Sequence, residues 1–149
     1  GIHWINFMAY LFGDITHVSV DRFPNPQNKT WLRIAQVVFA SGLRGMLKFF
    51  PCSGSQVERV EAHSNAQSVY LDGPLGDDPG KIVIEAGAER RIIQPEALVI
   101  APEIERIGIV DEYKAFFEAV CHGTPSRSTF QNAVNAMQVA EAIEYGRSF

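Results

Sequence analysis

The sequence predicts an α+β fold in which an open, mainly antiparallel β-sheet has helices packed on one face. One apolar helix comes first, about seven strand segments follow with links of hairpin length, and two helices close the chain. Strands joined by short links pair antiparallel, whereas a doubly wound sheet needs a helix between successive strands. A chain of 149 residues can bury roughly 70% of its unfolded surface as a single domain, so we expect residues 1–149 to form one domain.

The composition is that of an ordinary globular domain and argues against several functional classes. Apolar residues make up 46% and charged residues 20% of the chain, which is not a disordered balance. The net charge of −4 argues against a nucleic-acid-binding protein, because such proteins present a basic face. No apolar run reaches the length of about eighteen residues that a membrane span needs, and no secretory leader is recognised.

Two further features of the sequence bear on the cellular compartment and on whether the chain is part of a longer protein. Cys52 and Cys121 are far apart and fit free thiols in a reducing compartment, so we expect a cytoplasmic protein. The sequence opens on Gly1 rather than methionine and enters an apolar helix at once. From this we expect a fragment of a longer protein.

Residues 1–13 predict a three-turn helix that ends at Gly13, since glycine commonly follows the last helical residue. A helix that is apolar on nearly all sides should be buried in a core or an interface. Its polar residues His3, Asn6 and Tyr10 have the spacing i, i+3, i+7, which places them on one stripe. A buried histidine is more often a hydrogen-bonded core residue than a catalyst, so the stripe alone leaves both interpretations open.

Residues 15–23 predict a strand, with Val18 and Val20 on one side and polar side chains on the other. A loop rich in proline and asparagine follows at 24–29.

The clearest hairpin joins residues 30–39 to residues 43–50, with Gly42 at the turn. Apolar side chains stand on successive positions at 37–39 and at 49–50, so both faces of the sheet carry them. One face should meet the helices. We expect the other face to be an interface between copies of the chain.

The remaining segments are shorter. The pattern predicts strands at 56–63 and 67–71, a loop at 72–80, a hairpin of 81–86 with 90–94, and an extended excursion at 95–108.

Two helices close the chain. Apolar residues spaced by three and four predict a helix with one buried face that ends at Gly123: Val110, Tyr113, Phe116, Phe117 and Val120. A capping box at 128–131 begins the last helix, and Gly146 ends it. Its predicted inner stripe consists of Ala133, Met137, Ala140 and Ile143.

The first helix also carries a resemblance. Gly1-Ile2-His3-Trp4-Ile5-Asn6 with Tyr10-Leu11-Phe12-Gly13 resembles the G-x-H-x-x-D…L-F-G segment of the glucose–fructose oxidoreductase / inositol dehydrogenase / rhizopine-catabolism (Gfo/Idh/MocA) family. The hairpin at 39–42 and the order of the closing helices are similar to the C-terminal domain of that family. The likeness spans nearly the whole chain, mainly as an order of elements.

This resemblance implies the substrate-binding and oligomerising C-terminal domain of an NAD(P)-dependent oxidoreductase that oxidises a sugar, a polyol or a related hydroxy compound. His3 would be the catalytic residue, and Asn6 and Tyr10 would bind substrate; Asn6 stands where relatives commonly have aspartate. For Tyr10, packing in the core is the alternative. The NAD or NADP would be held by an N-terminal Rossmann domain, since no G-x-G-x-x-G follows a strand here. We expect no cofactor-binding residue in this chain, which would be inactive alone.

Other chemistries find less support. The four histidines lack the closely spaced partners of zinc motifs, so no metal site is predicted. A hydrolase would need a nucleophile–base pair, and Cys52 with His63 has no supporting signature. The main alternative is a non-enzymatic α+β module whose two-sided sheet serves dimerisation. The sequence leaves open which substrate is used, and whether NAD or NADP.

Overall fold

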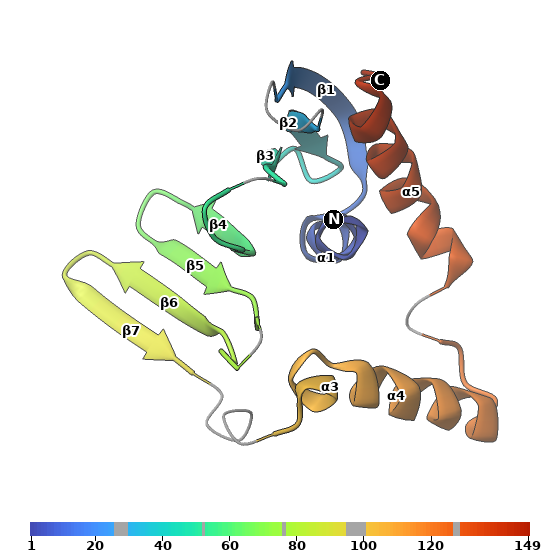
Figure 1. Ribbon diagram of the computed structural model, residues 1–149. Helices are drawn as coiled ribbons and strands as arrows, with labels where there is room; N and C mark the ends of the chain where they lie inside the picture. The colour runs from blue at the N-terminus through green and yellow to red at the C-terminus, as the bar shows by residue number, and fades with distance from the viewer. Residues whose placement is uncertain (26–29, 52, 76, 95–100, 127–128) are drawn as a thin grey trace. The chain divides into compact units, whose positions relative to one another are not determined.

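The computed structural model describes residues 1–25, 30–51, 53–75, 77–94, 101–126 and 129–149. The α+β class is confirmed, with open antiparallel sheets and helices. The elements are α1 (Ile2–Phe12), β1 (Ile15–Pro24), β2 (Trp31–Phe39), β3 (Arg44–Phe49), β4 (Arg59–His63), β5 (Ser68–Asp72), β6 (Lys81–Ala86), β7 (Glu89–Ile93), α3 (Glu103–Arg106), α4 (Ile109–His122) and α5 (Phe130–Tyr145) (Figure 1).

The strands divide between two sheets, where the sequence predicted a single one. One sheet has the order β1-β2-β3 and the other the order β4-β5-β6-β7. The chain correspondingly forms two compact units. The first unit comprises Gly1–Ser53 with Arg127–Phe149, and the second unit comprises Gly54–Ser126.

The hairpin of β2 and β3 in the first unit follows the predicted turn. Gly42 has a φ of 84°, a left-handed conformation that glycine adopts without steric cost. The amide of Phe39 donates to the carbonyl of Leu43 across the turn, at 2.9 Å. β1 pairs antiparallel with the other side of β2, for example Val18 with Val37. As predicted, Val18 and Val20 share a face, which is the face turned toward the helices.

The core of the first unit lies between this sheet and the helices α1 and α5, which Figure 1 shows beside β1. Burial of apolar side chains of this kind is the main stabilising contribution to a domain. The buried members are Ile5, Ile15, Val18, Ala35, Val37, Phe39, Ala136, Val139, Ala142 and Ile143.

The inner stripe of α5 differs from the prediction. Ile143 is buried as expected, but Met137 is 57% exposed, and Ala136 and Val139 are buried instead. The helix has alanine or valine on several sides, so its sequence defines more than one stripe of similar apolar character. Contact with β1 selects one of them: the Asn135 side chain exchanges two hydrogen bonds of 2.8 Å with the backbone of Ile15. Ser128 of the predicted capping box lies outside the described residues.

The second unit is built differently. Its four strands form an antiparallel meander, and in the described part of this unit Val83 alone among the apolar side chains is buried. β4 begins at Arg59 rather than at residue 56. One face of the sheet is apolar, and the register places Val60, Leu71 and Ile82 in one row across it.

Two predictions about the helices of the second unit were wrong. Residues 95–100 lie outside the described part of the chain, but residues 103–106 of the predicted extended segment form the short helix α3, where Glu103 and Glu105 favour the helix N-terminus. The helix α4 forms as predicted, and Gly123 ends it with a φ of 62°. Its predicted buried face is open, since Phe116 is 55% and Val120 62% exposed. Helical spacing specifies an apolar face without specifying what covers it.

Candidate functional site

The polar stripe of α1 points away from the core of the first unit. Ile5 is 1% exposed and belongs to the core that the helix shares with the sheet and α5, with Met8 and Phe12 packed against the same core. On the opposite side His3 is exposed, Asn6 is half-buried and Tyr10 is 82% exposed. The interpretation of His3 as a hydrogen-bonded core residue, and of Tyr10 as a packed one, is therefore excluded within this unit.

The stripe retains its full hydrogen-bonding capacity. Within the described residues, the side chains of His3, Asn6 and Tyr10 form no hydrogen bond or ion pair. Together an imidazole, an amide and a phenol offer both donors and acceptors. Such a set can bind a hydroxylated ligand, and an imidazole can also accept or relay a hydroxyl proton.

Aromatic side chains flank this stripe. Trp4 and Phe7 meet edge to face, with ring centroids 5.9 Å apart, and Leu11 is 48% exposed. Although the sequence predicted a buried helix, Ile5 is its fully buried residue. The outward side of α1 therefore combines polar groups with an apolar surface, the combination on which most small-molecule sites are built.

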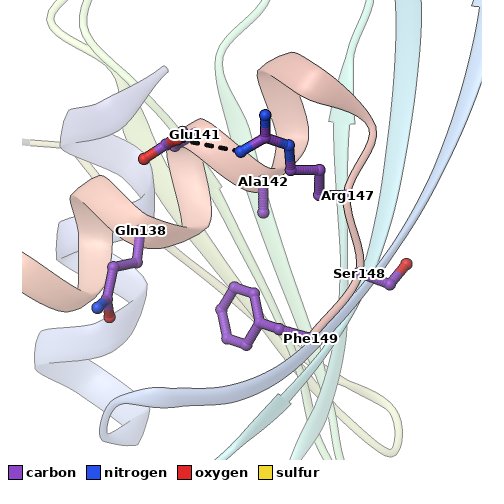
Figure 2. A pocket seen from close by; sticks show the side chains of 6 residues that line it. All are labelled: Gln138, Glu141, Ala142, Arg147, Ser148 and Phe149. Carbon is purple, nitrogen blue, oxygen red and sulfur yellow. Dashed lines mark hydrogen bonds and ion pairs between the residues drawn. The ribbon is translucent and has the colours of Figure 1, made fainter.

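Two hollows lie elsewhere on the molecule, and neither is lined by the α1 stripe. One hollow, of about 340 Å³, lies at the end of α5. Figure 2 shows the side chains that line it, among them the Phe149 ring and the ion pair of Glu141 with Arg147. The shortest nitrogen–oxygen distance in that pair is 3.4 Å. The second hollow, of about 470 Å³, follows the apolar side of α4 at Tyr113 and Phe116.

The second unit contains a serine–histidine pair that the sequence did not reveal. The Ser68 hydroxyl lies 3.0 Å from Nδ1 of His63, and a Glu61 carboxylate oxygen lies 3.8 Å from Nε2 of the same ring. Only the cross-strand register brings residues 63 and 68 together. The His63 and Glu61 side chains are 55% and 47% exposed. Nucleophilic catalysis relies on groups that are preorganised away from water. Because these side chains are exposed, the Ser68–His63 pair is best explained as a cross-strand contact.

An ion-pair group occupies the same face of this sheet. The Arg59 guanidinium donates to Asp72 at 2.5 Å, and the Lys81 ammonium lies 3.7 Å from the other oxygen of that carboxylate. The hydrogen bond from Arg59 holds the pKa of Asp72 below its usual range, and Asp72 in turn raises the pKa of Arg59. Each carboxylate here has a cationic partner, so the group is structural.

In the ranges that the structure describes, no three His, Cys, Asp or Glu side chains form a cluster suited to a metal ion. The Cys121 thiol is free and exposed; Cys52 lies outside the described residues. Among the described helices none is long and apolar enough to cross a membrane.

Several solved structures that share this arrangement of elements are named as oxidoreductases or dehydrogenases. A dehydrogenase from Chromobacterium violaceum has a TM-score of 0.77 at 21% identity, and an aldose–aldose oxidoreductase from Caulobacter crescentus has 0.72 at 17%. A candidate NADPH-dependent oxidoreductase from Desulfitobacterium hafniense has 0.74 at 12%. At these identities the likeness shows a shared fold.

The likeness covers nearly all of the present chain but less than half of each solved chain. The three comparisons cover 98–100% of the present chain but 44–45% of the solved chains. The chain thus spans about half the length of the proteins it resembles. No family model matches the sequence, and no curated protein sequence does either.

Proposed function

We propose that this chain is the substrate-binding part of an NAD(P)-dependent oxidoreductase of the Gfo/Idh/MocA type, acting on a sugar, a polyol or a related hydroxy compound. Residues 1–149 would be the C-terminal domain, inactive without a dinucleotide-binding Rossmann domain. The observation that carries the proposal is the outward stripe of His3, Asn6 and Tyr10, free of internal partners on a helix whose other side is anchored in the core.

The fold comparisons support this assignment. Proteins of the same fold are named as a dehydrogenase and as an aldose–aldose oxidoreductase, and one as a candidate NADPH-dependent enzyme. Each is about twice as long as this chain, which leaves room in those proteins for a second domain. A reducing cytoplasm is the proposed location, in keeping with the free thiol of Cys121.

The three residues of the stripe would have different roles in catalysis and substrate binding. The His3 imidazole would accept the hydroxyl proton of the substrate, because histidine is the side chain that most often acts as a general base. The Asn6 amide and the Tyr10 phenol would hydrogen-bond further hydroxyl groups and so fix the orientation of the substrate. When bound, NAD or NADP supplies the hydride acceptor.

A homo-oligomer through the sheet belongs to the same proposal. The face of the β1–β3 sheet that is turned away from α1 and α5 carries exposed apolar side chains, including Phe23 and Met46. This face equally favours the second candidate function, a non-enzymatic dimerisation module. Cofactor binding separates the two candidates, since a module needs neither nicotinamide nucleotide.

The test uses the longest natural polypeptide that contains these 149 residues. NADH and NADPH are titrated by fluorescence, and oxidation of a panel of aldoses, polyols and hydroxy acids is then followed at 340 nm. We expect binding of one nucleotide and turnover of at least one compound. His3→Gln should lower kcat by about 10²–10⁴-fold, the usual contribution of a general base, with the Kd of the nucleotide unchanged.

Matched variants sharpen this test. Tyr10→Phe removes one hydroxyl and should raise KM several-fold with a smaller effect on kcat. His122→Gln changes an exposed histidine of α4, whose Nδ1 lies 2.9 Å from the Glu118 carbonyl oxygen, and should leave turnover unchanged. Binding of neither nucleotide would favour the dimerisation module, and equal activity of His3→Gln and the wild type would remove His3 from the mechanism.

A further inference from the structure

We propose that the β1–β3 sheet, where it meets the last turn of α5, binds the carboxylate group of a small molecule. The binding groups are the side chains of Arg22 on β1 and Arg33 on β2, called the arginine pair below, with the Trp31 ring beside them. The α1 stripe supplies none of these groups, so the inference stands apart from the proposed oxidoreductase activity.

The strand register places the two guanidinium groups on one face of the sheet. Arg22 pairs with Arg33 between β1 and β2, and residues paired across strands project from the same face. This face is the one turned toward the helices, because Val18 and Val20 of the same alternation contribute to the core. Like charges directly opposite each other are destabilising, so the arginine pair requires negative charge close by.

Within the described residues, a single carboxylate pairs with these two arginines. Arg33 donates from Nη2 to Oε1 of Glu144 at 2.8 Å and from Nη1 to the Trp31 carbonyl oxygen at 3.3 Å. Arg22 forms no hydrogen bond or ion pair in that part of the chain, and its guanidinium stacks over the Trp31 ring at 4.3 Å. Two cations and one anion leave one positive charge uncompensated.

The arginine pair is also partly removed from water. The Arg33 side chain is 15% exposed, and Arg22 is half-buried. The Nε atoms of both are enclosed, and neither has an acceptor among the residues that the structure describes. Donors that have lost water without gaining an acceptor are costly. A charge-assisted hydrogen bond is strong in such surroundings, so an added anion would stabilise this part of the fold.

A carboxylate fits the arginine pair better than other anions. Its two coplanar oxygens match the donor fork of a guanidinium, and its single charge equals the one left uncompensated. A phosphate dianion would bring a second negative charge, which Glu144 repels and which must also be removed from water. A neutral sugar would supply no charge at all.

The arginine pair can be reached from solvent. Trp31 and its cross-strand partner Pro24 form the next row of the same face, and both are exposed. Gly146, with a φ of 66°, lets the chain leave α5 close to Arg22, since a Cβ there would collide with that side chain.

A purely structural role is the alternative for Arg22. α5 has no basic residue in its last turn, and a cation near a helix C-terminus interacts favourably with the helix dipole. This interaction explains the position of Arg22 but leaves its hydrogen-bond donors without acceptors. It also predicts no affinity for an added carboxylate, so a binding experiment distinguishes the two roles.

The test follows the arginine Nε–H signals of the intact protein, labelled with ¹⁵N-arginine, by NMR at constant ionic strength. The probes are glucuronate, glucose and glucose 6-phosphate, which present a carboxylate, no charge and a phosphate on similar sugars. Glucuronate should shift the signals of Arg22 and Arg33 saturably, with a millimolar or lower Kd. Glucose should shift neither signal, and glucose 6-phosphate should bind about threefold or more weakly than glucuronate.

Matched variants assign the binding to the arginine pair. Arg22→Gln should raise the Kd for glucuronate about tenfold or more, because a charge-assisted contact is lost. Arg22→Lys keeps the charge without the planar fork and should have an intermediate Kd. Arg44→Gln makes the same charge change at an exposed residue on the other face of the sheet and should leave the Kd unchanged, as should His3→Gln.

Several results would overturn the inference. They are the absence of a saturable shift up to about 100 mM glucuronate, tighter binding of glucose 6-phosphate, or a Kd of Arg22→Gln no higher than that of Arg44→Gln. Circular dichroism verifies that each variant is folded, and Arg22→Lys serves as the decisive variant if Arg22→Gln does not fold. Nicotinamide nucleotides are absent from these samples, so failure here leaves the oxidoreductase proposal to its own test.

Discussion

The two units of this molecule are stabilised in different ways. The first unit buries a continuous apolar core between one sheet face and two helices. In the second unit, as far as its residues are described, Val83 is the buried apolar side chain, while ion pairs and a serine–histidine contact cover one face of the sheet. Exposed ion pairs contribute little to stability compared with buried apolar area. We infer that the first unit carries most of the folding free energy.

Substitution of a core aromatic residue should give the largest effect. Phe39 is 1% exposed and meets the Phe12 ring at 5.5 Å. Phe39→Ala should lower the free energy of unfolding by about 3–5 kcal/mol, as buried phenylalanines do. Urea unfolding followed by tryptophan fluorescence reports this unit, because Trp4 and Trp31 both lie in it.

The matched control in the second unit is Phe116→Ala, at a side chain that is 55% exposed. Its effect should stay within about 0.5 kcal/mol, as is usual for surface sites. A loss comparable to that of Phe39→Ala would mean that α4 is covered in solution, and the contrast between the units would fail.

Hydrogen exchange should separate the units without any substitution. The amides of β2, the central strand of the first sheet, should exchange at least about 100-fold more slowly than those of β7, an edge strand whose residues are all exposed. Exchange of intact protein, read by mass spectrometry after peptic digestion, measures both strands in one sample. Equal rates in β2 and β7 would contradict the proposed difference in stability.

Two left-handed glycines provide a smaller, matched comparison. Gly146 and Gly87 have φ values of 66° and 61°, so alanine costs about 1 kcal/mol at either site. Around Gly87 a Cβ would find open space, but at Gly146 it would collide with the side chain of Arg22, which stacks over Trp31 at 4.3 Å. Gly146→Ala should therefore lose about 1 kcal/mol more in thermal unfolding. Equal losses would show that Arg22 moves aside freely.

The ion-pair group of the second unit should give the smallest effect. Because the folded pKa of Asp72 is lowered by Arg59, the carboxylate stabilises the fold above its ordinary value of 3.8, and this contribution is lost as the pH falls through the lowered pKa. Asp72→Asn should lower Tm by no more than about 2 °C at pH 6, and the difference should vanish near pH 2. Asp111→Asn on α4 is the control; a Tm difference that grows in acid would reverse the assigned sign.

Local rules explain what the sequence predicted correctly. The hairpin at Gly42 follows from turn chemistry, and the shared face of Val18 and Val20 follows from strand alternation. The choice of stripe on α5 and the uncovered face of α4 depend on partners far along the chain, which a period within one helix cannot identify.

In the candidate site, too, local spacing predicted some features, and distant contacts determined the others. Helical spacing alone places His3, Asn6 and Tyr10 on one stripe. Which side of α1 turns inward was decided by Ile5, Met8 and Phe12 fitting the core formed with the sheet and α5, and the sequence offered other apolar sides. The Ser68–His63 contact was not predicted because it depends on the register between two strands.

The final residues have a consequence for protein engineering. The Phe149 backbone exchanges hydrogen bonds of 2.8 and 3.0 Å with Val18, and thereby covers part of the free edge of β1. Removing residues 147–149 would leave the amide and carbonyl of Val18 without partners on a sheet edge, where strands of other molecules can attach. A chain that lacks these residues should therefore be more prone to aggregate.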